Sequence, residues 1–286
     1  IALLRHNGVF AFLPACLAVF GLCKPGRRRA ALLAVCSALL CVLLPKGLET
    51  ALHATQAPSS EMMSVPCQQL MRTAARAEIS EEEYAEISAW FSDAVARYRP
   101  HCADPAKGGN FDFARYQADP GAFWSMYLRY AKAHPRVYIE AFLENCAGLW
   151  NPDDISHSNS LGGEDYDFVY MNTAYTYDDG RYDIHPRSFL PGLKNALYQF
   201  THHSAQQKVP FLSQLFCPAT YSFALLLGTL LLFCRRQRRL ALCLTPVWGI
   251  FLSLLFSAGI FVRYAYPMMA AMPVMLALIL FSGKAE

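Results

Sequence analysis

Apolar segments at the two ends of the chain constrain its fold most strongly. Five of them, residues 8–23, 30–44 with a helical extension toward residue 52, 211–233, 240–258 and 264–281, have or approach the length of a membrane span. A bilayer core of ~30 Å needs about 20 apolar residues in a helix. The whole chain is 54% hydrophobic and 16% charged, which is too apolar for an ordinary soluble protein of 286 residues. We therefore predict an all-α, polytopic membrane protein.

Two short basic turns predict the orientation of these segments. Residues 24–29 (KPGRRR) separate the first two apolar segments, and residues 235–239 (RRQRR) separate the third and fourth. Short loops rich in Lys and Arg stay on the cytoplasmic side. The prediction is a multi-pass protein of the cytoplasmic membrane with residues 53–208 outside the cytoplasm. Because the first two segments are short, a re-entrant or interfacial hairpin is the alternative for them.

The pattern divides the chain into three parts: residues 1–52 with two membrane helices, the polar residues 53–208, and residues 209–286 with three membrane helices. The net charge of +3 does not indicate nucleic-acid binding, because the basic residues cluster in the turns and not on one face of a folded domain. The chain begins with Ile1 and carries no cleavable signal segment. We therefore expect it to be the C-terminal part of a longer protein.

Helix start and stop signals dominate the first half of the polar part. We expect helices from residue 64 onward, over 82–98 with Ser80 as N-cap, over 120–130, and from Pro135 to about residue 146. Residues 151–188, rich in Asp, Ser, Gly and Tyr, predict a long loop. In the following residues, 189–200, Leu190, Leu193 and Leu197 share one face, which is typical of a helix lying on a membrane surface.

Neither the cysteines nor the acidic residues form a known disulfide or metal pattern. Only Cys67, Cys102 and Cys146 belong to the polar part, and an odd number allows at most one bridge there. The segment from Asp153 to His185 has enough carboxylates and imidazoles for Ca²⁺ or Mg²⁺ but no known metal-loop spacing, so we predict a solvated acidic loop. A glycosidase carboxylate pair could come from the same segment, although nothing in the sequence fixes their separation. We expect no metal and no cofactor.

Several stretches of the chain carry a family resemblance. They are Arg5-His6-Asn7-Gly8, Ser64-Val65-Pro66-Cys67-Gln68-Gln69 with Arg72, Asp104-Pro105-Ala106-Lys107, Trp124 with His134-Pro135-Arg136-Val137-Tyr138 and Ala141-Phe142, Trp150-Asn151-Pro152-Asp153, and Arg263-Tyr264-Ala265-Tyr266-Pro267. Together they resemble an uncharacterised family of bacterial polytopic membrane proteins that look like GT-C-type glycosyltransferases. His6 and Asn151 depart from the family pattern, where Asn and Tyr are expected. None of these stretches is a catalytic signature.

The resemblance implies an enzyme that takes sugars from polyprenyl-phosphate carriers outside the cytoplasm. In GT-C-like enzymes the catalytic carboxylate typically lies in the first outer loop, so we expect it outside this chain and assign no catalytic residue. A non-enzymatic envelope protein, such as an accessory or assembly factor for cell-surface polymers, is the alternative. A transporter is disfavoured, because it would need charged groups within its spans and these spans are nearly uncharged.

The candidate binding residues are cations and polar side chains at the outer interface. Arg263, with Tyr264 and Tyr266 beside it, breaks the positive-inside pattern and could grip a lipid phosphate, or it could anchor to headgroups. Partners are then membrane lipid and a polyprenyl-phosphate-linked sugar.

Two further sets of candidates lie in the polar part. Gln68, Gln69 and Arg72 follow a proline at a helix start and could bind sugar or phosphate, although a face that is solvated or packs on a neighbouring loop is favoured. Asp104 and Lys107 could orient a substrate hydroxyl, although a capped turn with a surface ion pair is favoured. Trp124 and Trp150 could stack on a sugar ring, and we favour a role in the core.

Overall fold

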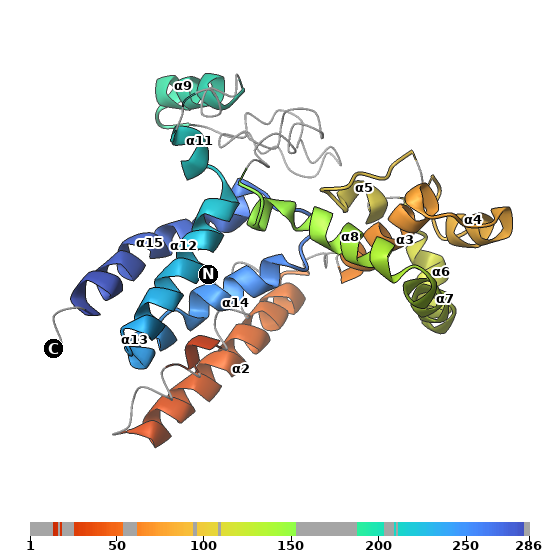
Figure 1. The fold of residues 1–286 in the computed structure, drawn as a ribbon. Helices are drawn as coiled ribbons and strands as arrows, with labels where there is room; N and C mark the ends of the chain where they lie inside the picture. The colour runs from red at the N-terminus through yellow and green to blue at the C-terminus, as the bar shows by residue number, and fades with distance from the viewer. Residues whose placement is uncertain are drawn as a thin grey trace.

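The computed structural model describes residues 14–16, 18, 26–53, 62–93, 96–107, 110–152, 188–202, 209 and 211–282. Every regular element in these ranges is a helix, so the predicted all-α class is confirmed for them. Figure 1 shows one group of helices, α3 to α8, beside a second group made of α2 and α12 to α15. The helices are α2 (Arg27–Ala51), α3 (Ser64–Arg76), α4 (Glu81–Ser88), α5 (Asp104–Lys107), α6 (Phe113–Ala118), α7 (Pro120–Ala133), α8 (Pro135–Asn145), η2 (Ala147–Leu149), α9 (Pro191–His202), α11 (Leu212–Leu215), α12 (Pro218–Cys234), α13 (Arg238–Leu242), α14 (Thr245–Leu254) and α15 (Val262–Ser282).

The helix α15 contains a window, Tyr264–Phe281, that is long and apolar enough to cross a membrane. Only 17% of that window is buried, so most of its residues are at least partly exposed. Among the described residues it is the one candidate span found; α12 and α14 are also apolar but shorter, with 17 and 10 residues. The helices α12, α14 and α15 pack on one another through apolar side chains that include Tyr221, Leu225 and Met268.

The predicted third and fourth spans are wrong in extent. Residues 211–233 form the short helix α11 and then α12, with the break at Cys217 immediately before Pro218. Residues 240–258 form α13 and α14, separated by Cys243 and Leu244 just ahead of Pro246. A proline has no N–H to donate and fits the first turn of a helix, so each proline lies in the first turn of a new helix where a continuous one was expected.

The N-terminal apolar segments are described in part. Most of the predicted first span, residues 8–23, lies outside the described ranges. The second is confirmed as a helix, because α2 runs for 25 residues. It begins after Gly26, whose positive φ of 89° is accessible to glycine and turns the chain at the first basic loop. Several of its large apolar side chains, among them Leu33, Leu40 and Leu43, are exposed.

The helices α3 to α8 enclose their own apolar core. The helix α3 lies at its centre, and its Cys67, Leu70 and Met71 are fully buried. Phe123 from α7 is also fully buried, and its ring lies 5.2 Å from that of Trp90 in an edge-to-face arrangement. Aromatic pairs in this geometry add to the free energy gained from burial alone. The predicted helices from residue 64, over 120–130 and from Pro135 are confirmed as α3, α7 and α8.

The predicted helix over residues 82–98 is wrong beyond its first two turns. Ser80 caps α4 as expected: its hydroxyl accepts from the N–H of Glu83, and the Glu83 carboxylate accepts from the N–H of Ser80. The helix nevertheless ends at Ser88, because Phe91 pairs with Phe111 in an antiparallel bridge. Burial of these two rings against the core outweighs the helical preference of the segment.

A short connection joins the two groups of helices. The link between α14 and α15 pairs with the α3–α8 group through backbone contacts. The N–H of Ala103 donates to Ala258 O, and Cys102 and Gly259 form an isolated antiparallel β-bridge. Asn145 at the end of α8 donates from Nδ2 to the carbonyl of Ser257 at 2.8 Å. The α3–α8 group therefore sits at the same end of the C-terminal helices as this link.

The helix α9 confirms the predicted amphipathic segment as a helix, with Leu193 and Leu197 exposed. Its membrane-surface position remains a prediction. The predicted acidic loop falls mostly outside the described ranges, as do Asp153 and His185.

Candidate polar site between α3 and α8

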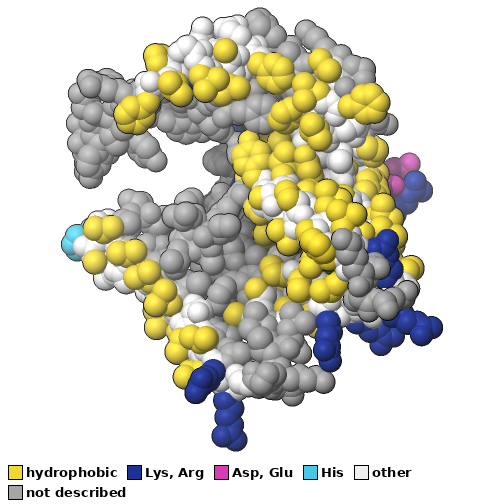
Figure 2. Space-filling view, turned by 90° about the vertical axis from the view of Figure 1, so that its left-hand side faces the viewer, with side chains coloured by type: hydrophobic (Ala, Val, Ile, Leu, Met, Phe, Trp, Pro, Cys, Tyr) yellow, Lys and Arg dark blue, Asp and Glu magenta, His cyan; other side chains and the backbone are white. Residues whose placement is uncertain are grey.

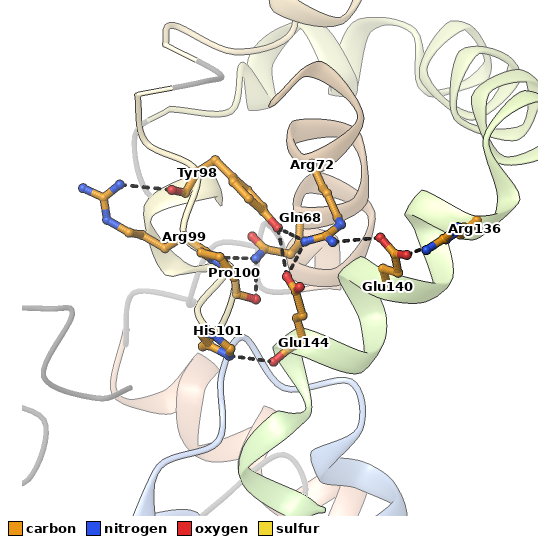
Figure 3. Close-up of polar contacts among 9 residues, drawn as sticks. All are labelled: Gln68, Arg72, Tyr98, Arg99, Pro100, His101, Arg136, Glu140 and Glu144. Carbon is orange, nitrogen blue, oxygen red and sulfur yellow. Dashed lines mark hydrogen bonds and ion pairs between the residues drawn. The ribbon is translucent and has the colours of Figure 1, made fainter. Parts of the chain in front are cut away.

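A network of charged and polar side chains lies where α3 packs on α8, with Arg72 at its centre (Figure 3). The Arg72 Nη1 group donates to the hydroxyl of Tyr98 at 2.9 Å and to the carboxylate of Glu144. The Nη2 group donates to the carboxylate of Glu140 at 2.9 Å. Glu140 also accepts from Arg136 Nε at 2.7 Å. Two cations and two carboxylates thus face one another, and their formal charges balance.

The network has a buried cation and a more open carboxylate side. The Arg72 side chain is 10% exposed, whereas those of Glu140 and Glu144 are 38% and 36% exposed. Hydrogen bonds from Arg72 and then Arg136 hold the pKa of Glu140 below its usual range, so this carboxylate stays ionised at neutral pH. Burial raises the pKa of Tyr98, which keeps its hydroxyl protonated.

Gln68 fixes the segment beside the network. Its Nε2 group donates to the carbonyls of Arg99 and Pro100, the latter at 3.0 Å. The following residue, His101, contacts the Glu144 carbonyl through Nδ1 at 3.1 Å. Figure 3 shows that Arg99 points its guanidinium away from the network. Gln68 therefore ties the chain that carries Tyr98 to the helix that carries Arg72.

Two buried polar atoms in this place have no hydrogen-bond partner among the described residues: Gln68 Oε1, an acceptor, and Arg72 Nε, a donor. Gln68 is 1% exposed, so leaving its oxygen unpaired carries a desolvation cost. Gln68 Oε1 can accept a hydrogen bond from a water or a hydroxyl group, and Arg72 Nε can donate one. The partly exposed carboxylates of Glu140 and Glu144 can also accept hydrogen bonds from hydroxyl groups.

The structure brings together two of the three residues predicted on α3. Gln68 and Arg72 share a face, as the spacing of four residues predicts. Gln69 belongs to a neighbouring contact, where Nε2 donates to Tyr138 O at 3.1 Å and Oε1 accepts from the Tyr127 hydroxyl at 2.5 Å. Of the two favoured alternatives, a solvated face is wrong, since all three are buried. Packing on a neighbouring loop is confirmed for Gln68, which donates to the carbonyls of Arg99 and Pro100.

Asp104 and Lys107 form an ion pair of 3.1 Å on the short helix α5, so the predicted pairing is confirmed. The expectation of a surface pair is wrong for Lys107, whose side chain is 5% exposed. It is buried because α5 packs against α3. Trp124 and Trp150 are 37% and 49% exposed, so the predicted core role is wrong for both. Their ring nitrogens reach Tyr116 Oη and Leu143 O at the surface of the helices.

The candidates on α15 lie near its start. The side chain of Arg263 is outside the part of the chain that the structure describes. Tyr264 packs edge-to-face on Phe261 at 5.3 Å, and Tyr266 is 45% exposed. The same link that leads into α15 pairs with Cys102 and Ala103, just after the segment held by Gln68. The candidates on α3 and those on α15 therefore both lie next to the link between α14 and α15.

Sequence reasoning missed Tyr98, Glu140 and Glu144, which complete the network. A signal was available for the glutamates, because two like charges four residues apart are unfavourable on an isolated helix. Such a pair indicates a cation from another element. Its identity could not be read from the sequence, since Arg72 lies about 70 residues earlier in the chain. Tyr98 carried no comparable signal.

A family model described as a family of unknown function (DUF6020) matches residues 2–285. The chain belongs to this family. The match covers nearly the whole chain and agrees with the expectation of an uncharacterised family, while the GT-C resemblance stays a prediction. No curated protein and no solved structure matches the chain. Among the described residues, no group of His, Cys, Asp and Glu side chains has the arrangement of a metal site.

Proposed function

We propose that this protein is a multi-pass, glycosyltransferase-like protein that acts on lipid-linked sugars at the outer face of the cytoplasmic membrane. The observation that carries the proposal is the placement of the α3–α8 group against the link between α14 and α15. This puts the open carboxylates of Glu140 and Glu144 near the end of a helix with the length and composition of a membrane span.

The distribution of charge supports this orientation. The basic turn that contains Arg235, Arg236 and Arg239 follows α12, whereas the α14–α15 link lies at the far end of α14 from that turn. Figure 2 shows most of the Lys and Arg side chains on this face in its lower part, with hydrophobic side chains above them. Basic residues favour the cytoplasmic side, which leaves the α3–α8 group outside.

The site chemistry favours a sugar at the α3–α8 network. The guanidinium of Arg72 already donates to two carboxylates, so a phosphate would have to displace one of them. Carboxylates that stay ionised accept hydrogen bonds from sugar hydroxyls. The carrier phosphate is better assigned to Arg263, at the outer end of α15 with Tyr264 and Tyr266 in the same turn and the next. The catalytic base is not assigned.

The decisive experiment compares two ligands on the full-length protein in nanodiscs: a polyprenyl-phosphate-linked sugar and the bare polyprenyl phosphate. Arg263→Lys and Arg263→Ala should weaken binding of both ligands, by roughly ten- to a hundred-fold, because a hydrogen bond to a charged group is worth ~1.5–3 kcal/mol. Glu144→Gln should weaken only the sugar-linked form. Glu82→Gln, an exposed position on α4, is the control and should change neither.

Equal binding of both ligands by all variants would remove these residues from a substrate site.

One observation favours that outcome, and with it a non-enzymatic accessory role in the cell envelope. The charges of Arg72, Arg136, Glu140 and Glu144 neutralise one another within the fold, as they do in a network that only stabilises packing. For an accessory protein, the variants should then not differ from the parent in binding either ligand, although deletion of the protein would still alter a cell-surface polymer.

A further inference from the structure

The helix α8 exposes an apolar face on the side opposite α3. Its buried positions are Tyr138, Ala141 and Asn145, whereas Ile139 and Leu143 are 59% and 46% exposed. Ile139 and Leu143 are four residues apart, so their side chains lie next to each other along the helix. A solvated helix normally carries polar groups on such a face. This face therefore indicates contact with something apolar.

The apolar face continues onto neighbouring elements. The ring of Phe142 lies 6.4 Å from that of Phe256, just beyond the end of α14. Trp150 donates from its indole nitrogen to the carbonyl of Leu143 at 3.1 Å, which fixes the ring beside α8. Phe256 is 69% exposed. We call this continuous patch the α8 surface; it consists of Ile139, Phe142, Leu143, Trp150 and Phe256.

The α8 surface begins at the end of the C-terminal helices. Leu149, in the turn that follows α8, is 2% exposed and packs among residues of α12, α14 and α15, including Tyr221 and Met268. Leu252, one turn before Phe256 on α14, is 52% exposed, so the outward apolar side of α14 leads directly into the patch. In Figure 1, α8 runs to the side of α12 and α15 and does not continue along them.

We infer that the α8 surface rests in the outer leaflet of the bilayer, with α8 lying along the membrane interface. The inference depends on the proposed membrane location of α12 to α15. The patch is continuous with the outward side of α14, through Leu252 and Phe256. Acyl chains that surround Leu252 would therefore also cover Phe256 and the apolar face of α8, which favours lipid over a protein partner. A half-exposed tryptophan at the edge, Trp150, is typical of the interface between acyl chains and headgroups.

This position has a consequence for the polar network. Glu140 and Glu144 occupy the flank of α8 between the exposed apolar face and the buried face against α3. With the apolar face among the acyl chains, these carboxylates lie at the level of the lipid headgroups. A sugar attached to a lipid carrier is presented at that level. The α8 surface thus sets the depth at which the network meets its substrate.

The test measures depth in the bilayer with a fluorescent bimane probe on single cysteines. The full-length protein, with its accessible native cysteines replaced by serine, carries Ile139→Cys or Leu143→Cys in nanodiscs that contain brominated lipids. Leu128→Cys on α7, an equally exposed leucine of the same group of helices, is the matched control. Leu276→Cys, exposed on α15, reports whether the span itself is in the membrane.

We expect brominated lipids to quench the probe at residues 139 and 143 several-fold more than at residue 128. Iodide in the aqueous phase should show the opposite order. Equal quenching by lipid at residues 128, 139 and 143 would overturn the inference, as would protection of 139 and 143 from both quenchers, which would indicate a protein partner. Quenching at residue 276 separates these results from a failure of the membrane proposal, in which residue 276 would also be unquenched.

Discussion

At the scale of single residues, Arg72 shows how a polar group is accommodated inside a helical core. Its guanidinium is held by Glu140, Glu144 and Tyr98, so its charge is neutralised where little water reaches it. The sequence predicts that Gln68 and Arg72 share a face, because four residues make about one helical turn. It could not predict which face α8 would present to them, since that depends on the packing of two helices far apart in the chain.

Replacing Arg72 with Lys should destabilise the α3–α8 group. A single ammonium can bind one carboxylate well but cannot span both glutamates as the planar guanidinium does. We expect a loss of roughly 1–2 kcal/mol, below the ~3–5 kcal/mol of a fully buried pair, because the glutamates are about a third exposed. Thermal unfolding of the full-length protein in detergent measures it. Arg76→Lys, one turn further along α3 and exposed, should have little effect, and equal losses in both variants would contradict the assignment.

Glu140 should make stability depend on pH. Because its pKa is lowered in the folded state by Arg72 and Arg136, its ionised form stabilises the fold above the ordinary glutamate pKa of about 4.3. That contribution is lost as the pH falls through the lowered folded-state value. The melting temperature of Glu140→Gln should therefore lie below that of the parent at pH 7 and approach it below about pH 4. A difference that stays constant from pH 7 to pH 3, or one matched by the exposed Glu78→Gln, would show that charge at Glu140 is not involved.

At the scale of elements, local signals located helix starts well and helix ends poorly. Ser80 and Pro120 each begin a helix as predicted, since capping and a fixed proline φ act within one turn. The end of α4 depends on Phe91 meeting Phe111, a contact 20 residues away. Pro218 and Pro246 are local signals for a helix start, but the long apolar segments around them led to the prediction of continuous helices. Each lies in the first turn of a new helix.

The turn after α8 offers a test of how the two groups of helices are joined. A Cβ added at Gly148 would lie 2.9 Å from Ile260 Cβ and 3.0 Å from its Cγ2, in the link between α14 and α15. A β-branched side chain held close to the backbone cannot move away easily. Gly148→Ala should therefore cost roughly 1–3 kcal/mol. Gly192→Ala on α9, where nothing lies within 4 Å, is the control.

The same unfolding measurement distinguishes the outcomes. Gly192→Ala should leave the protein unchanged or slightly more stable, because alanine favours a helix over glycine. If Gly148→Ala is equally harmless, the contact between Gly148 and Ile260 does not hold the α3–α8 group to the link.

At the scale of the whole molecule, the chain is organised by where its charge and its apolar surface lie. The basic turn after α12 and the α3–α8 group belong to opposite ends of the C-terminal helices. The outward sides of α2, α12 and α15 carry exposed leucines such as Leu40, Leu227 and Leu280. Exposed apolar surface over several long helices is costly in water and favourable in lipid. The arrangement thus supports the proposed multi-pass topology with the polar network on the outer side.

Labelling of cysteines in intact cells tests that topology directly. A membrane-impermeant maleimide should modify a cysteine placed at Asp154, in the predicted outer loop, and should spare cysteines placed at Arg28 and Gln237, in the two basic turns. The native Cys234 is exposed beside Arg235 and should also be spared until the membrane is permeabilised, which makes it an internal control. The physical basis is the positive-inside preference, which acts through short loops such as these. Modification at Gln237 in intact cells, with Asp154 protected, would invert the molecule and place Glu140 and Glu144 in the cytoplasm, where a carrier-linked sugar on the outer leaflet could not reach them.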